Sequence, residues 1–205
     1  KMVNVRFHAS RSPAQAPFLD EVRTDVQRRA DLAFPDRVLP LSQLRMTEFG
    51  LIEVPEIGQI GLTRWSRGQL ARMLGIRWNR WFDDALVSPK ERADEVNRRL
   101  ERQSAELKVR ARRYGPEDVP FGDGVLRAFV SPGYTPIDDV RVFDRMAGVL
   151  GSRARDFRFV RVDLTDRSSQ YVALTHEDIN LGNGKPDPHR NGILIVNSEV
   201  GASAL

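Results

Sequence analysis

The 205-residue chain contains no cysteine, which excludes disulfide bonds, thiolate catalysis and zinc fingers. Its three histidines are too few for a histidine-rich metal site. No apolar run approaches the roughly 18 residues that a membrane span needs, and residues 1–10 lack the apolar centre of a signal peptide. Hydrophobic residues make up 40% of the chain, enough for a buried core. We therefore expect a cytoplasmic protein that does not enter a membrane.

Lysine is scarce as well, because 28 of the 32 basic residues are arginine. Residues 88–113 hold nine basic and five acidic residues, a local excess as large as the net charge of +4 of the whole chain. Arginine grips phosphate at two points and stacks on bases, so this excess favours nucleic acid as a partner. A GC-rich genome, which prefers arginine codons, explains the arginine content equally well.

Hydrophobic periodicity predicts an α+β fold, with a helical N-terminal half followed by a β-hairpin, a helix and further antiparallel strands. Residues 1–16 show no hydrophobic periodicity, so we expect them to form a flexible arm. Residues 17–205 predict a single domain, with a helical subdomain over 66–104 and mainly sheet over 105–205. Helix-capping signals stand at Ser66, with Gln69 three residues on, and at Ser88, before Pro89.

The most informative segment is a predicted strand over residues 107–112, which pairs with a return strand over 125–130. Alternation places three apolar residues on one face and three cations on the other. An exposed cationic strand beside aromatic residues can hold a single nucleic-acid strand. The predicted nucleic-acid-binding residues are Lys108, Arg110, Arg112, Arg113, Arg127 and Tyr134.

Two alternatives accompany this prediction. In the first, Trp78 and Trp81 stack on bases in place of Tyr134, although their spacing favours a structural role. In the second, the phosphate-binding surface is the Arg98–Arg99–Arg102 face of the preceding helix in place of the strand. Because exposed charges contribute little to stability, we expect reversal of Arg110 and Arg112 to glutamate to leave the fold intact.

Other chemistry is weakly supported. Residues 69–86 suggest a helix-turn-helix, but Asp83 and Asp84 would face a phosphate backbone unfavourably. The acidic and histidine residues of 176–189 match no metal-ligand spacing and predict solvated loops. We expect no catalytic group, metal or cofactor. Glu199 is predicted to cap backbone N–H groups, with a catalytic carboxylate beside Asp138 and Asp139 as the alternative.

Four segments together resemble the phage- and plasmid-like family catalogued as domain of unknown function 932. They are Gln69–Leu70 with Leu74–Ile76, Leu126–Ser131, Tyr134–Asp139 and Asn197–Leu205. One departure is the absence of the basic residues that usually flank the tyrosine. In this family the domain normally continues beyond the last segment, so the resemblance implies a truncated C-terminus.

The resemblance implies a phage or plasmid protein that acts near replication and recombination. A distant likeness to single-strand annealing proteins of the Rad52 type is an analogy of fold. We therefore predict a homo-oligomeric protein that binds and anneals single-stranded DNA. A protein–protein interaction factor, active in anti-defence or assembly and without a nucleic-acid role, is the main alternative. An enzyme that uses Glu199 and the Asp138–Asp139 pair is the other.

Overall fold

The computed structural model describes residues 7–10, 16–77, 86–116, 120–164, 168–175, 179–180, 188–189 and 192–200. The chain divides into two compact units, one built around residues 32–135 and one from residues 5–31 with 136–205. We call them unit 1 and unit 2. Both combine helices with a sheet, so the predicted α+β class is confirmed. The sequence had predicted one domain over residues 17–205, whereas the structure has two separate cores.

Unit 1 contains a six-stranded sheet with the order β2-β6-β7-β5-β4-β3. β5 and β7 run parallel, and the other neighbouring pairs are antiparallel. The strands are β2 (Arg37–Pro40), β3 (Arg45–Met46), β4 (Ile52–Val54), β5 (Gly58–Leu62), β6 (Glu106–Arg112) and β7 (Gly124–Val130). The helices are α2 (Arg64–Met73), α4 (Pro89–Leu100) and the short 3-10 helix η2 (Leu41–Gln43).

The predicted cap of α4 is confirmed. The Ser88 side chain accepts a hydrogen bond from the Glu91 N–H, the Glu91 carboxylate accepts one from the Ser88 N–H, and Pro89 opens the helix. The start of α2 differs from the prediction, because Thr63 caps the helix in place of Ser66. Gly75, at a φ of +64°, ends it.

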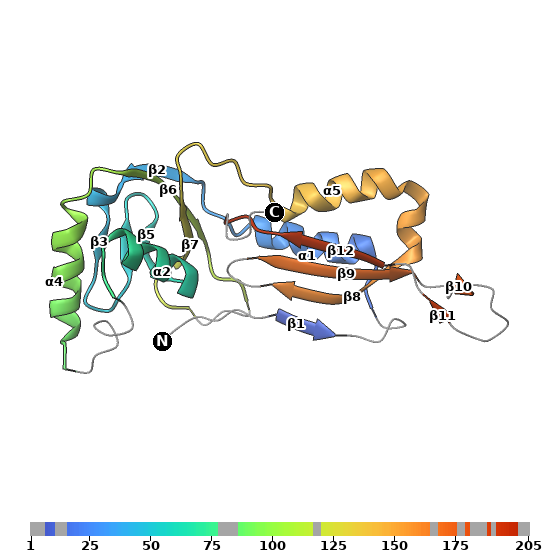
Figure 1. The fold of residues 1–205 in the computed structure, drawn as a ribbon, viewed down its shortest axis with the longest axis horizontal. Coiled ribbons are helices and arrows are strands. Elements are labelled where there is room, and N and C mark those ends of the chain that lie inside the picture. The colour runs from blue at the N-terminus through green and yellow to red at the C-terminus, as the bar shows by residue number, and fades with distance from the viewer. Residues whose placement is uncertain are drawn as a thin grey trace. The chain divides into compact units, whose positions relative to one another are not determined.

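The core of unit 1 lies between the sheet and the two helices. α2 contributes Leu70 and Leu74, and α4 contributes Val96 and Leu100, all of them buried. α4 stands beside β3 (Figure 1), where the Asn97 side chain bonds to both the N–H and the carbonyl of one β3 residue. Both helices are therefore fixed to the sheet by apolar packing and by uncharged hydrogen bonds.

Unit 2 contains a four-stranded antiparallel sheet with the order β1-β8-β9-β12 (Figure 1). The strands are β1 (Phe7–Ser10), β8 (Phe157–Leu164), β9 (Ser169–Thr175) and β12 (Gly192–Asn197), with β10 (Ile179–Asn180) and β11 (Pro188–His189) as a separate pair. The helices are α1 (Leu19–Ala30), α5 (Asp139–Leu150) and the 3-10 helix η3 (Gly151–Asp156). The three C-terminal strands of the main sheet were all predicted.

The core of unit 2 joins α1 and α5 to β8 and β9. Phe143 of α5 is fully buried, with its ring centroid 4.7 Å from that of Tyr171 and 5.6 Å from that of Phe159. The predicted flexible arm over 1–16 is wrong for residues 7–10, which pair with β8, and for Ala16, which is buried. A four-residue strand is too short to show a period, so the sequence gives no sign of it.

The predicted helical character of the N-terminal half fits only loosely, because five strands precede α4. Within the described part of the chain, no helix is long and apolar enough to cross a membrane.

Candidate nucleic-acid interface

The three cations of β6 occupy different environments. The Lys108 ammonium is half-buried and donates a hydrogen bond to the Tyr134 carbonyl at 2.5 Å. The Arg110 side chain is buried, at 8% residue exposure, and its Nε lies 3.1 Å from Asp36 Oδ1. Arg112 is half-buried and donates to the Arg113 carbonyl at 3.0 Å. The prediction that these three side chains form an exposed row is wrong.

The reason lies in the neighbouring strand. Arg110 stands opposite Ala128 and Lys108 opposite Val130, and both of these β7 residues are buried. Every β7 residue except Arg127 is buried, so both faces of the hairpin are covered. The available signal was that six of the seven β7 residues are apolar or glycine, with only Arg127 charged, because a strand with one solvent face alternates in polarity. Reversal of Arg110 would set a carboxylate beside Asp36, so it would not leave the fold intact as the sequence suggested.

The other three predicted residues are placed as follows. Arg113 is exposed, and its guanidinium lies 4.5 Å from the centroid of the Phe34 ring. Arg127 is half-buried at an irregularity of the β6–β7 pairing, and its carbonyl accepts a hydrogen bond from the Thr63 hydroxyl. Tyr134 is half-buried. The structure brings Lys108 and Tyr134 together but does not assemble the six residues into one exposed surface.

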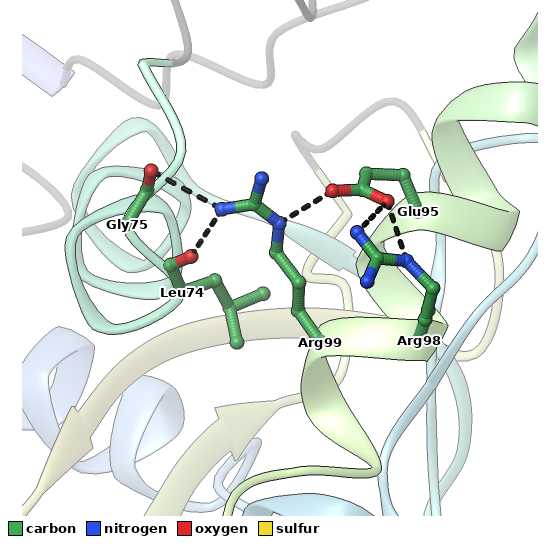
Figure 2. A network of polar contacts seen from close by, with 5 residues as sticks. All are labelled: Leu74, Gly75, Glu95, Arg98 and Arg99. Carbon is green, nitrogen blue, oxygen red and sulfur yellow. Dashed lines mark hydrogen bonds and ion pairs between the residues drawn. The ribbon is translucent and has the colours of Figure 1, made fainter.

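In the alternative surface on α4, Arg98 and Arg99 make side-chain contacts within the fold, and Arg102 is exposed. Arg99 donates to the carbonyls of Leu74 and Gly75 at the C-terminus of α2, and Glu95 accepts from both Arg98 and Arg99 (Figure 2). A cation at a helix C-terminus is favourable, since the last carbonyls carry partial negative charge. The hydrogen bonds from Arg98 and Arg99 lower the pKa of Glu95. Arg99 therefore links α4 to the end of α2, whereas Arg98 pairs with Glu95 within α4.

An acid-free stretch of arginines stands elsewhere in unit 1. Residues 57–82 contain five arginines and no aspartate or glutamate. Three of these arginines, Arg64, Arg72 and Arg77, are exposed on α2 and the segment that follows it, and none has an ion pair among the residues that the structure describes. We call these three residues the arginine face. Gly68 lies between Arg64 and Arg72 on the outer side of the helix, and the space at its Cα is open.

Uncharged groups attach α2 to the sheet. The Ser66 hydroxyl donates to the Leu126 carbonyl at 2.7 Å. The Gln69 side chain donates to the Phe129 carbonyl at 2.8 Å and accepts from the Phe129 N–H at 3.0 Å, as a neighbouring strand would. Leu70 and Leu74 supply the apolar packing, so these contacts hold α2 without the three exposed guanidinium groups.

Sequence reasoning missed this surface because it measured charge by net excess. Outside residues 88–113 the basic and acidic residues are equal in number, so the net charge of that part is zero. This zero sum conceals the acid-free run, because the charge of its five arginines is cancelled by acidic residues on either side of it: Glu48, Glu53, Glu56, Asp83 and Asp84. A search for the longest stretch without acidic residues would have found it.

Only the first half of the proposed helix-turn-helix lies within the described residues. α2 ends at a left-handed Gly75, with the Ile76 N–H bonded to the Ala71 carbonyl, which is a tight helix-ending turn. Residues 78–85, which include Trp78, Trp81 and the Asp83–Asp84 pair, lie outside the described residues. The loop residues 176–178 and 181–187 of the weak metal hypothesis also lie outside them, and the described residues contain no group of three or more metal-ligating side chains.

The carboxylates of the enzyme alternative form a network in unit 2. Glu199 Oε1 accepts the Asp139 N–H at 2.9 Å, at the first turn of α5, so the predicted capping role of Glu199 is confirmed. The Asp139 carboxylate accepts hydrogen bonds from the side chains of Ser169, Tyr171 and Asn197 at 2.7–2.8 Å. Each bond ties β9 or the end of β12 to α5.

Burial raises the pKa of Asp139, and the nearby Glu199 charge raises it further. Burial also raises the pKa of Tyr171. Three donors occupy the Asp139 carboxylate, so the network joins the C-terminal strand to a helix. Its arrangement is that of a structural polar cluster.

No protein-family model, curated protein or solved structure matches this chain. The resemblance to domain of unknown function 932 therefore stays a prediction from the four segments.

Proposed function

We propose that this is a cytoplasmic protein that binds single-stranded DNA through the arginine face of α2 and supports strand annealing in phage or plasmid replication and recombination. The observation that carries the proposal is the exposure of Arg64, Arg72 and Arg77 on an acid-free segment that the fold holds without them. Exposed guanidinium groups on an acid-free stretch of sequence are available to phosphates, and each phosphate contact gains free energy through counterion release.

Aromatic residues in the same stretch favour a single strand over a duplex. Trp65 is half-buried and follows Arg64 directly, and its position three residues before Gly68 places it on the same side of α2. Bases of a single strand are free to stack on such rings whatever their sequence. Annealing needs no cofactor, since base pairing supplies the free energy and the protein has only to align the strands.

The test is a titration of labelled oligonucleotides by filter binding at several salt concentrations. We expect wild-type affinity to be insensitive to base sequence and to fall steeply with salt. The Arg64→Gln/Arg72→Gln variant removes two phosphate contacts, so its log–log salt slope should be flatter by about 1.4, at about 0.7 per contact on a single strand. Its melting temperature should match that of wild type, because exposed charges contribute little to stability.

Arg141→Gln/Arg145→Gln is the matched control, with the same loss of charge from exposed arginines on α5 in unit 2. It should keep the wild-type slope. Equal losses in both variants would mean that only net charge matters and would overturn the assignment to α2. No binding by the wild type at micromolar concentration would overturn the nucleic-acid function and favour the interaction factor.

A further inference from the structure

The four-stranded sheet of unit 2 ends at β12, whose only partner in the described part of the chain is β9. β12 reads Gly-Ile-Leu-Ile-Val-Asn and contains no charge and no proline. Leu194 is 65% exposed and Val196 is 38% exposed. An edge strand presents a row of backbone N–H and carbonyl groups that can pair with another strand.

The edges of the unit 1 sheet carry features that oppose such pairing. β2 ends at Pro40 and contains Arg37, which forms an ion pair with Glu56. β3 is two residues long and contains Arg45. Prolines, charges and short length are the usual protections of a sheet edge. β12 has six residues and none of the other two protections.

The exposed side chains of β12 have an apolar neighbour on β9. Ile193 and Ile195 pack toward the core that contains α1 and α5, so Leu194 and Val196 point to the opposite face of the sheet. On that face Leu194 stands opposite Val172 of β9, which is half-buried. A partner at this edge would therefore gain backbone hydrogen bonds together with apolar burial.

The charge of unit 2 suits a second copy of the same chain. Unit 2 has fourteen basic and fourteen acidic residues, a net charge of zero. Two copies therefore meet without net repulsion between these units, and the edge itself brings no like charges together. An acidic or basic partner would find no complementary charge on β12.

We propose that β12 pairs antiparallel with β12 of a second copy, about a two-fold axis that passes through Ile195 and joins the two sheets. A two-fold axis perpendicular to the sheet leaves the two faces of the sheet unchanged, so a residue can pair only with one whose side chain lies on the same face. The numbers of the two paired residues must therefore be both odd or both even. Centred on Ile195, the pairing sets Leu194 opposite Val196 of the second copy, twice. Centred on Leu194, it would set Val196 opposite Gly192 and leave the valine without an apolar neighbour.

The proposal is tested first by the oligomeric state, measured by light scattering after size exclusion at micromolar protein without DNA. We expect a dimer for wild type and a monomer for Leu194→Lys. Val38→Lys is the matched control, since Val38 is an exposed valine on the β2 edge, and it should remain dimeric. A monomeric wild type, or a dimeric Leu194→Lys, would overturn the proposal.

Cross-linking then tests the register, and the absence of native cysteine makes the result unambiguous. Leu194→Cys mixed with Val196→Cys should give a disulfide-linked dimer under mild oxidation, because the two positions face each other. Neither variant should cross-link alone, since equivalent positions lie roughly 8 Å apart, beyond disulfide reach. Efficient cross-linking of Leu194→Cys alone would overturn this register. Arg64→Gln/Arg72→Gln should stay dimeric, which separates this inference from the proposed DNA binding.

Discussion

Units 1 and 2 share a plan of helices packed on a sheet but distribute charge differently. Unit 1 has seventeen basic and fourteen acidic residues over 32–135, a net charge of +3, whereas unit 2 is neutral. In unit 1 the arginine face stands on α2 and the segment after it, and the sheet edges carry proline or arginine. In unit 2 the edge strand β12 is uncharged and apolar. The comparison supports the proposals of an anionic partner for unit 1 and of self-association for unit 2.

The two units also use different chemistry to fix a helix to the sheet. In unit 1, Ser66 and Gln69 bond to strand backbone through neutral groups. In unit 2, the buried Asp139 carboxylate gathers three donors at the start of α5. A neutral amide or hydroxyl does not titrate near neutral pH, whereas a buried carboxylate couples folding to protons. The two units should therefore respond differently to core mutation, to loss of an ion pair and to pH.

The largest expected effect is on the core of unit 2. Phe143→Ala removes a fully buried ring that contacts Phe159 and Tyr171. The free energy of unfolding of unit 2 should fall by about 3–5 kcal/mol, as is typical of an emptied aromatic site. Hydrogen exchange measured on β8 and β9 reports this loss. Unchanged protection of those strands would contradict the separate core that we describe for unit 2.

A smaller effect is expected at the buried ion pair of unit 1. Asp36→Ala leaves the Arg110 guanidinium without this carboxylate and should lower the free energy of unfolding by about 1.5–3 kcal/mol. The control is Asp25→Ala, which breaks the exposed pair with Arg28 and should cost about 0–1 kcal/mol. Urea titrations of both variants give the comparison. Similar losses of unfolding free energy in the two variants would contradict the burial of the Arg110–Asp36 pair and favour the exposed Arg110 that the sequence suggested.

The smallest effect is a pH dependence in unit 2. Because burial and Glu199 raise the pKa of Asp139 in the folded state, the protonated form is favoured there. The stability that comes from protonated Asp139 is fully present below the pKa of Asp139 in the unfolded chain, and it is lost as pH rises through the pKa of Asp139 in the folded protein. Asp139→Asn cannot lose a proton, so its melting temperature relative to wild type should increase as pH rises through that range. Asp144→Asn, on an exposed face of α5, should show no such increase, and a parallel change in both variants would contradict the assignment.

The sequence by itself determined the local elements and several of their ends. Ser88, Pro89 and Glu91 specify the start of α4, and Gly75 and Gly151 end α2 and α5, because caps and left-handed positions depend on a few neighbouring residues. β6 follows from a polarity pattern of two-residue period, whereas β7 and the three C-terminal strands follow from short runs rich in apolar residues. The sequence also predicted that Glu199 caps backbone N–H groups, but it did not identify the Asp139 N–H as the group that is capped.

Only the tertiary structure decided which surfaces are covered. The cations at Lys108 and Arg110 alternate as an exposed face would, yet Asp36, Tyr134 and β7 enclose them, and these partners stand up to 74 residues away. The division into two units has the same origin, since α1 packs in the core of unit 2, beside strands that begin more than a hundred residues later. Alternation records which residues share a face, but burial depends on what packs against that face, and long-range packing leaves no period in the sequence.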